Sequence, residues 1–341
     1  MSFGKRVREF FLLADFKRTV LVIIPCLLVL AMVVLMFYYD TYTNHFDVQR
    51  NASSQAAGLG HSVVTGYTTV ATLQRVIRGL WEKRGGYLSN DVTPPSVIMD
   101  NVPNWEYGVL RQARDLALIL RYDMSRSQSQ STEDENLQIA QNKLNIDSEK
   151  WLLPRAEAEY QDAVAALGRY LTDLTDENQT GAQFFARADN LREWLAVVEK
   201  QLGSLASRLN ASVGANRINT DLSGDPAAQQ ATVSPGEIRV KTPWLQIDDV
   251  FYEARGTCWA LIHLMRAVEI DFAQVLDKKN ATASLRQIIR DLEATQATMW
   301  SPMVLNGTGF AFTANHSLVM ASYISQANAA IIDLRNLLEQ G

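Results

Sequence analysis

The sequence predicts an all-α protein, with a single N-terminal transmembrane helix followed by an elongated antiparallel helical bundle that has coiled-coil-like seams. Three observations predict it. Residues 19–39 form an uncharged, largely apolar run of 21 residues. Later segments place apolar residues at alternating spacings of three and four, which is the period of a helix packed along a seam. Only residues 238–241 alternate in the way a short edge strand does.

The composition fits a folded protein and excludes several other classes. The chain has 341 residues, of which 47% are hydrophobic and 20% are charged, so neither a disordered nor a collagen-like protein is expected. The formal charge of −5 argues against a nucleic-acid partner. Two cysteines are too few for a disulfide scaffold or for a cysteine-rich metal site.

Residues 19–39 are predicted to be a transmembrane signal-anchor helix that holds the chain in a lipid bilayer. The run is long enough to cross the hydrocarbon core, and the small-residue cleavage pattern of a signal peptide does not follow it. Residues 1–18 form a basic tail with a net side-chain charge of +3. Because the whole chain carries −5 and residues 19–39 are uncharged, residues 40–341 carry −8. By the positive-inside rule, the tail is cytoplasmic and residues 40–341 lie outside the cytoplasm.

The predicted bundle fills residues 40–341. Apolar stripes mark helices at 59–80, 105–122, 137–151, 160–174, 184–209, 247–275, 285–299 and 320–338. Two of these stripes share a register across a short break, so we expect residues 155–213 to form an antiparallel helical hairpin. The helix at 247–275 is apolar on more than one face, which is typical of a helix surrounded by neighbours. Long loops interrupt the bundle at 85–104, 217–245 and 301–316.

No catalytic, metal or cofactor motif is found in the sequence. The chain lacks the H-E-x-x-H, G-x-S-x-G and G-x-x-x-x-G-K-[ST] patterns. We therefore expect no cofactor and assign no catalytic or metal-binding residue. An enzyme with an unrecognised site built from the loops stays open as an alternative, and its first suspects are Asp100, Asn315 and His316.

Two segments carry candidate interaction residues. In the 247–275 helix, His263 is interpreted as a hydrogen-bonded core histidine, with a functional histidine as the alternative, and Arg255 and Arg266 are expected to be salt-bridged inside the bundle or at a groove. The 301–316 loop is unusually apolar and either tucks into the bundle or contacts a partner. The candidate interaction or groove residues are Tyr252, Arg255, Trp259, His263, Arg266, Phe310, Phe312, Asn315 and His316.

Several segments resemble one known family. They are NVPNWEYGVL (101–110), SRSQSQS (125–131), FFARADNLREWL (184–195), IDDVFYEARGTCWALIHLMRAVEIDF (247–272), SPMVLNGTGFAFTANHS (301–317) and LVMASYISQANAAIIDLRNLL (318–338). Over nearly its whole length, the chain is similar to a proteobacterial family of inner-membrane proteins catalogued as the domain of unknown function numbered 2333. The resemblance implies a Gram-negative bacterium and a periplasmic outer domain. It implies no activity, substrate or site.

The leading hypothesis is a non-enzymatic inner-membrane protein whose periplasmic domain is a scaffold or docking protein for envelope partners, or associates with a second copy of itself. A periplasmic ligand-sensing bundle is the alternative. It would act through a separate transducer, because residues 1–18 are too few to form a cytoplasmic output domain. A secretion adaptor of the membrane-fusion kind would need a β-rich domain, which the sequence pattern does not predict.

Overall fold

The computed structural model of the chain describes residues 3–127, 132–176, 181–218, 237–301, 303–308 and 313–340. Within these residues there are eleven α-helices and a single two-stranded ribbon, so the all-α prediction is confirmed. The helices in chain order are α1 (Phe3–Tyr39), α2 (Val48–Leu59), α3 (Tyr67–Glu82), α4 (Asn101–Ile119), α5 (Glu135–Leu144), α6 (Ala156–Thr175), α7 (Ala188–Asn210), α8 (Ile247–Asp271), α9 (Ala273–Lys278), α10 (Thr282–Ala294) and α11 (His316–Glu339).

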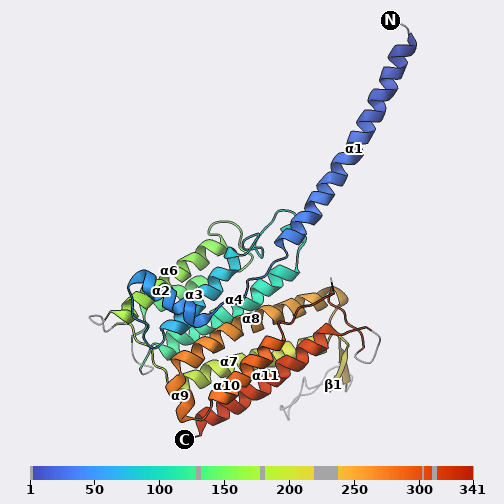
Figure 1. Cartoon of the computed structure of the whole chain (residues 1–341). Helices are drawn as coiled ribbons and strands as arrows, with labels where there is room; N and C mark the ends of the chain where they lie inside the picture. The colour runs from blue at the N-terminus through green and yellow to red at the C-terminus, as the bar shows by residue number, and fades with distance from the viewer. Residues whose placement is uncertain are drawn as a thin grey trace, which may run out of the picture.

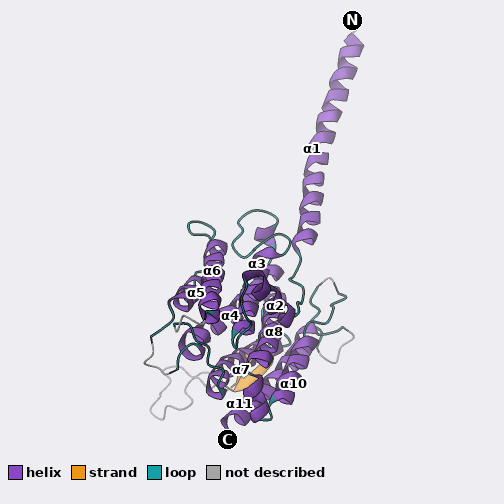
Figure 2. Cartoon of the chain, turned by 60° about the vertical axis from the view of Figure 1, so that its left-hand side comes forward, coloured by secondary structure: helices purple, strands orange, loops and turns teal. Residues whose placement is uncertain are grey.

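Helix α1 projects away from the bundle (Figures 1 and 2). It contains the segment Val20–Tyr39, which is long and apolar enough to cross a membrane and is not buried against the rest of the chain. The predicted basic tail and the predicted apolar run belong to this one continuous helix. Residues 40–47 then lead into the bundle without regular structure.

Helix α8 is surrounded by neighbours, as its apolar faces predict. Of its 25 residues, 18 are buried, and it contacts α3, α4 and α10 among others. The crossing with α4 is very close. A Cβ atom on Gly256 would lie 2.1 Å from the carbonyl oxygen of Trp105, and one on Gly108 would lie 2.2 Å from the carbonyl oxygen of Glu253. The two backbones therefore touch at a point where neither helix has room for a side chain.

Two groups of helices flank the α4–α8 pair (Figure 1). On one side α3 packs against α8, α6 against α3, and α5 against α6. On the other side α10 packs against α8, α11 against α10, and α7 against α11. The buried residues of these helices form one hydrophobic cluster, so the apolar stripes predicted from the sequence are largely covered within one chain.

The helical hairpin predicted over residues 155–213 is wrong. Helix α6 packs against α3 and α5, whereas α7 packs against α11. The segment before α7 is attached to the chain just beyond the end of α4, where the N–H of Phe185 donates to the carbonyl of Met124 at 2.7 Å. A shared register shows that two helices each need an apolar partner, but it does not say which partner they find. Here α11, from the other end of the sequence, covers α7.

Other boundaries also differ from the predicted ones. The helix expected at 59–80 corresponds to α3, which begins only at Tyr67, because α2 already ends at Leu59. The start of α3 is capped by the carboxylate of Asp271, which accepts from the N–H and the hydroxyl of Thr69 at 2.7 and 2.6 Å. The loop at 85–104 contains the short 3₁₀ helix η1 (Ser96–Ile98) and the beginning of α4. The expected edge strand is present as β2 (Glu237–Val240), antiparallel to β1 (Ala215–Ile218).

Candidate functional site

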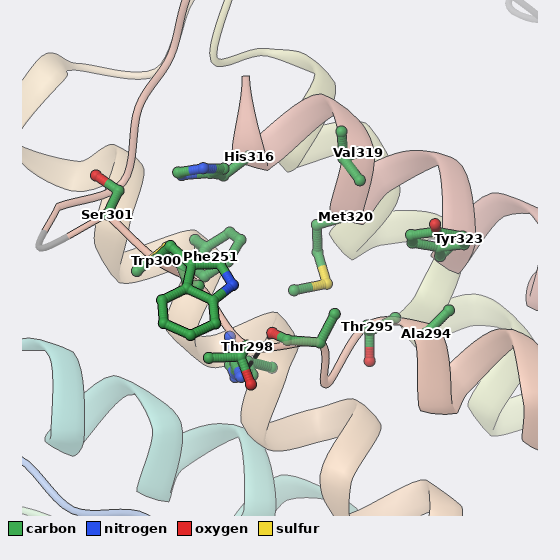
Figure 3. Close-up of a pocket in the computed structure, with 13 residues that line it drawn as sticks. Phe251, Ala294, Thr295, Thr298, Trp300, Ser301, His316, Val319, Met320 and Tyr323 are labelled. Carbon is green, nitrogen blue, oxygen red and sulfur yellow. Dashed lines mark hydrogen bonds between the residues drawn. The ribbon is translucent and has the colours of Figure 1, made fainter. Parts of the chain in front are cut away.

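The candidate site is a groove between α8, α11 and the segment that follows α10, here called the α8–α11 groove. Its volume is about 530 Å³. In Figure 3 the rings of Trp300 and His316 lie at one end of the groove and Tyr323 lies at the other. Phe251 from α8 and Met320 from α11 contribute to a lining that is mostly apolar. A lining of this kind with a few polar groups is typical of a binding site.

Arg255 attaches the segment after α10 to α8. Its Nη2 atom donates to the carbonyls of Gln296 and Ala297, both at 3.1 Å, and the amide of Gln296 donates back to the carbonyl of Arg255. Across the described part of the chain, no carboxylate pairs with Arg255, so its predicted salt bridge is wrong. Main-chain carbonyls take the place of a carboxylate. Among the described residues, the guanidinium of Arg255 therefore has no carboxylate in direct contact.

His316 provides a second hydrogen-bond donor at the groove. It is the first residue of α11, directly after Asn315, whose side chain caps the helix by accepting from the N–H of Leu318 at 2.9 Å. The Nδ1 atom of His316 accepts the N–H of Leu305 at 3.0 Å, so in the neutral ring the hydrogen is on Nε2. Burial lowers the pKa of His316 below its ordinary value. The neutral ring therefore offers a donor on Nε2.

None of the other predicted residues that the structure describes lines this groove. Tyr252 stacks on Tyr42 with ring centroids 5.6 Å apart, and Trp259 packs against Trp105 at 5.2 Å. Arg266 pairs with Glu293 as expected, but both side chains are partly exposed. The last two predicted residues, Phe310 and Phe312, lie outside the described residues. Among the described residues of the predicted set, Arg255 and His316 are therefore the two that line the groove.

His263 connects the segment after α1 to the central helix. Its ring is fully buried and stacks on Phe46 at 4.2 Å. Its Nδ1 atom donates to the carbonyl of Trp259 at 2.8 Å, while Nε2 accepts the N–H of Phe46 at 3.2 Å. Both nitrogens are therefore satisfied in the neutral state, as expected of a hydrogen-bonded core histidine. Desolvation lowers the pKa of His263 to about 3, with smaller contributions from the Trp259 carbonyl, which opposes the shift, and from nearby His45 and Arg266.

The low pKa of His263 predicts a pH-dependent loss of stability. Because the pKa is lower in the folded state than the ordinary value of 6.5, the stabilisation is complete above pH 6.5 and is lost as the pH falls from 6.5 towards 3. Between pH 7 and pH 5 the wild-type protein should lose about 2 kcal/mol more of its free energy of unfolding than the variant His263→Gln. Urea unfolding of both proteins at the two pH values measures this difference. Equal losses would show that His263 does not titrate in this way.

Sequence reasoning missed Trp300, whose side chain is 94% exposed, as well as Thr298 and Tyr323. The apolar stripe at 285–299 places Thr298 in a helix, and Trp300 falls between that stripe and the expected loop at 301–316. Helix α10 instead ends at Ala294, and the carbonyls of Gln296 and Ala297 in the segment that follows accept from Arg255. One signal was present in the sequence, namely a tryptophan that belongs to no apolar stripe.

Comparison with known proteins identifies the family. The chain matches the family described as "Uncharacterized protein conserved in bacteria (DUF2333)" over residues 14–341. It belongs to this family. The family that the sequence resembles is therefore confirmed. No curated protein matches the chain, and no solved structure matches it. Since the family description assigns no activity, the function is argued below from α1 and the α8–α11 groove.

Proposed function

We propose that this bacterial protein is anchored in the inner membrane by Val20–Tyr39 and that its periplasmic helical domain docks a partner protein of the cell envelope in the α8–α11 groove. The length and hydropathy of α1 support the anchor. The positive charge of residues 1–18 supports a cytoplasmic N-terminus. The docking role is non-enzymatic, and the observation that carries it is the exposed Trp300 at the rim of an apolar groove.

The chemistry of the groove favours a protein segment as its occupant. Tryptophan, tyrosine and arginine dominate the binding energy of protein interfaces, and Trp300, Tyr323 and Arg255 all line this groove. Because Trp300 is 94% exposed, its ring has most of its apolar surface left to bury against a partner. The Arg255 guanidinium, which has no carboxylate in direct contact among the described residues, and the Nε2 donor of His316 favour a segment that carries apolar side chains together with a carboxylate.

The experiment compares Trp300→Ala with Trp244→Ala. Trp244 is a matched control, because its side chain is 80% exposed but does not line the groove. The full-length proteins are cross-linked in cells of the native bacterium, purified in mild detergent and analysed by mass spectrometry. A partner should be recovered with the wild type and with Trp244→Ala, and its recovery should fall about tenfold or more with Trp300→Ala. Equal recovery with all three proteins would place the docking surface elsewhere.

A ligand-sensing bundle is the second candidate function. The observation that favours it is the groove volume of about 530 Å³, which is within the range of small-molecule sites. In that case native mass spectrometry of the purified full-length protein should show a bound small molecule, and Trp300→Ala should lose it. A bound small molecule without a cross-linked protein partner would favour sensing over docking.

A further inference from the structure

Two loops lie together at the end of the bundle where α1 enters it (Figures 1 and 2). They are residues 83–100, between α3 and α4, and residues 145–155, between α5 and α6, and are here called the paired loops. The hydroxyl of Tyr87 donates to the carbonyl of Ser148 at 3.1 Å, and the amide of Asn90 donates to the carbonyl of Lys150 at 3.0 Å. The two loops therefore form one surface rather than two independent tips.

This surface exposes large apolar side chains. Three are consecutive in one loop, and Leu153 among them is 85% exposed. The others are 52–56% exposed. The exposed apolar residues of the paired loops are Val92, Val97, Ile98, Trp151, Leu152 and Leu153. Single exposed apolar residues are normal on a water-soluble surface, but a group of them marks a contact with an apolar partner.

The position of η1 beside α1 indicates which partner this is. A hollow of about 330 Å³ is lined on one side by Val33, Met36 and Phe37 of α1, and on the other by Ile98 and Met99. At 1.5 Å per residue, Val33 lies about 9 Å along the helix axis from Tyr39, the last residue of the apolar segment. The tip of the first paired loop thus reaches beside the last turns of the segment that is long enough to span a bilayer.

We propose that the paired loops are a second membrane contact, whose apolar tips enter the boundary between headgroups and acyl chains in the periplasmic leaflet. This inference rests on the anchor part of the proposed function and not on its docking part. Segments that lie in this boundary bury their apolar side about 5–10 Å deep, and Ile98 of η1 shares a hollow with Val33, Met36 and Phe37 in the last turns of α1. Trp151 suits the same layer, because tryptophan is enriched at membrane interfaces. Together with α1, the loops fix the orientation of the helical domain on the membrane.

The test measures how deep single positions lie in the full-length protein reconstituted in phospholipid vesicles. In a Cys26→Ala background, with Cys258 fully buried, one cysteine is introduced at a time and labelled with an environment-sensitive fluorophore. The variants are Leu153→Cys and Val97→Cys in the paired loops, Leu28→Cys in α1, and Ser325→Cys on an exposed face of α11. Each label is quenched either by iodide in the buffer or by a nitroxide carried on the lipid.

The labels at Leu153 and Val97 should behave like the one at Leu28, with strong quenching by the lipid nitroxide and protection from iodide, whereas the label at Ser325 should do the opposite. If Leu28 is in lipid while Leu153 and Val97 behave like Ser325, the paired loops do not touch the membrane although the anchor stands. If Leu28 is accessible to iodide, the anchor itself is refuted and this inference is refuted with it. Two labelled positions in separate loops guard against an artefact from one substitution.

Discussion

Replacing Lys83 with methionine is expected to lower the free energy of unfolding by about 3–5 kcal/mol. The side chains of Lys83 and Glu106 are 2% and 0% exposed, and Nζ lies 2.6 Å from Oε1. The carboxylate of Glu106 also accepts from the N–H groups of Leu88 and Ser89. Without Lys83 these partners remain, but the carboxylate loses its counter-charge in a region that water does not reach. Urea unfolding of the full-length protein in mild detergent measures the loss.

Two further variants test whether the burial of the Lys83–Glu106 pair causes the loss of stability in Lys83→Met. Lys143→Met removes a more exposed lysine that pairs with Glu159 and Asp162, and it should cost no more than about 1 kcal/mol. The double variant Lys83→Met with Glu106→Gln removes both charges and should recover part of the stability lost in the single variant. If Lys83→Met were as mild as Lys143→Met, the Lys83–Glu106 pair would have to be hydrated in solution.

The Lys83–Glu106 pair also bears on the proposed membrane contact of the paired loops. Glu106 is on α4, while Lys83, Leu88 and Ser89 belong to the first paired loop. The buried carboxylate therefore holds this loop on the bundle and sets the height of η1 beside α1. The same substitution that lowers stability should loosen the loop, and a fluorophore at Val97 should then become more accessible to iodide.

The parts of the fold that could be predicted from the sequence depend on local signals. The apolar run in α1 and the apolar faces of α8 are each contained in one segment. The helix that is long and apolar enough to cross a membrane, and the central helix, therefore follow from composition and spacing. In each case the interacting groups lie within a few turns of one helix.

The parts that could not be predicted depend on which distant segments meet. Seam patterns on α6 and α7 show that both helices need cover, but not that α11 supplies it for α7. Arg255 and Trp300, which are 45 positions apart in the sequence, line one groove because the segment after α10 is attached to α8 through the carbonyls of Gln296 and Ala297. A charged residue is most often exposed, so sequence alone gives no reason to bury Lys83.

Replacing Gly256 with alanine is expected to destabilise the protein by about 3 kcal/mol, at the upper end of the usual cost of overpacking a core. The new Cβ atom would lie 2.1 Å from the carbonyl oxygen of Trp105, a backbone atom that a side-chain rotation cannot move away. The helices α4 and α8 must then separate along their crossing. Trp259 packs against Trp105 at this level, so the tryptophan contact should loosen as well. Thermal unfolding followed by circular dichroism measures the change.

Gly203→Ala is the control, because it has the same effect on helix propensity as Gly256→Ala but creates no backbone clash. Gly203 lies inside α7, and a Cβ atom there would meet nothing nearer than Asn328 Nδ2 at 3.6 Å. Alanine is the better helix former by about 1 kcal/mol, so Gly203→Ala should leave stability unchanged or raise it. At Gly256 the same gain in helix propensity is present but is outweighed by the backbone clash. A loss of stability in Gly256→Ala without a loss in Gly203→Ala would therefore support the close α4–α8 contact. If Gly256→Ala were as well tolerated as Gly203→Ala, the two backbones would not touch as closely as the structure has them.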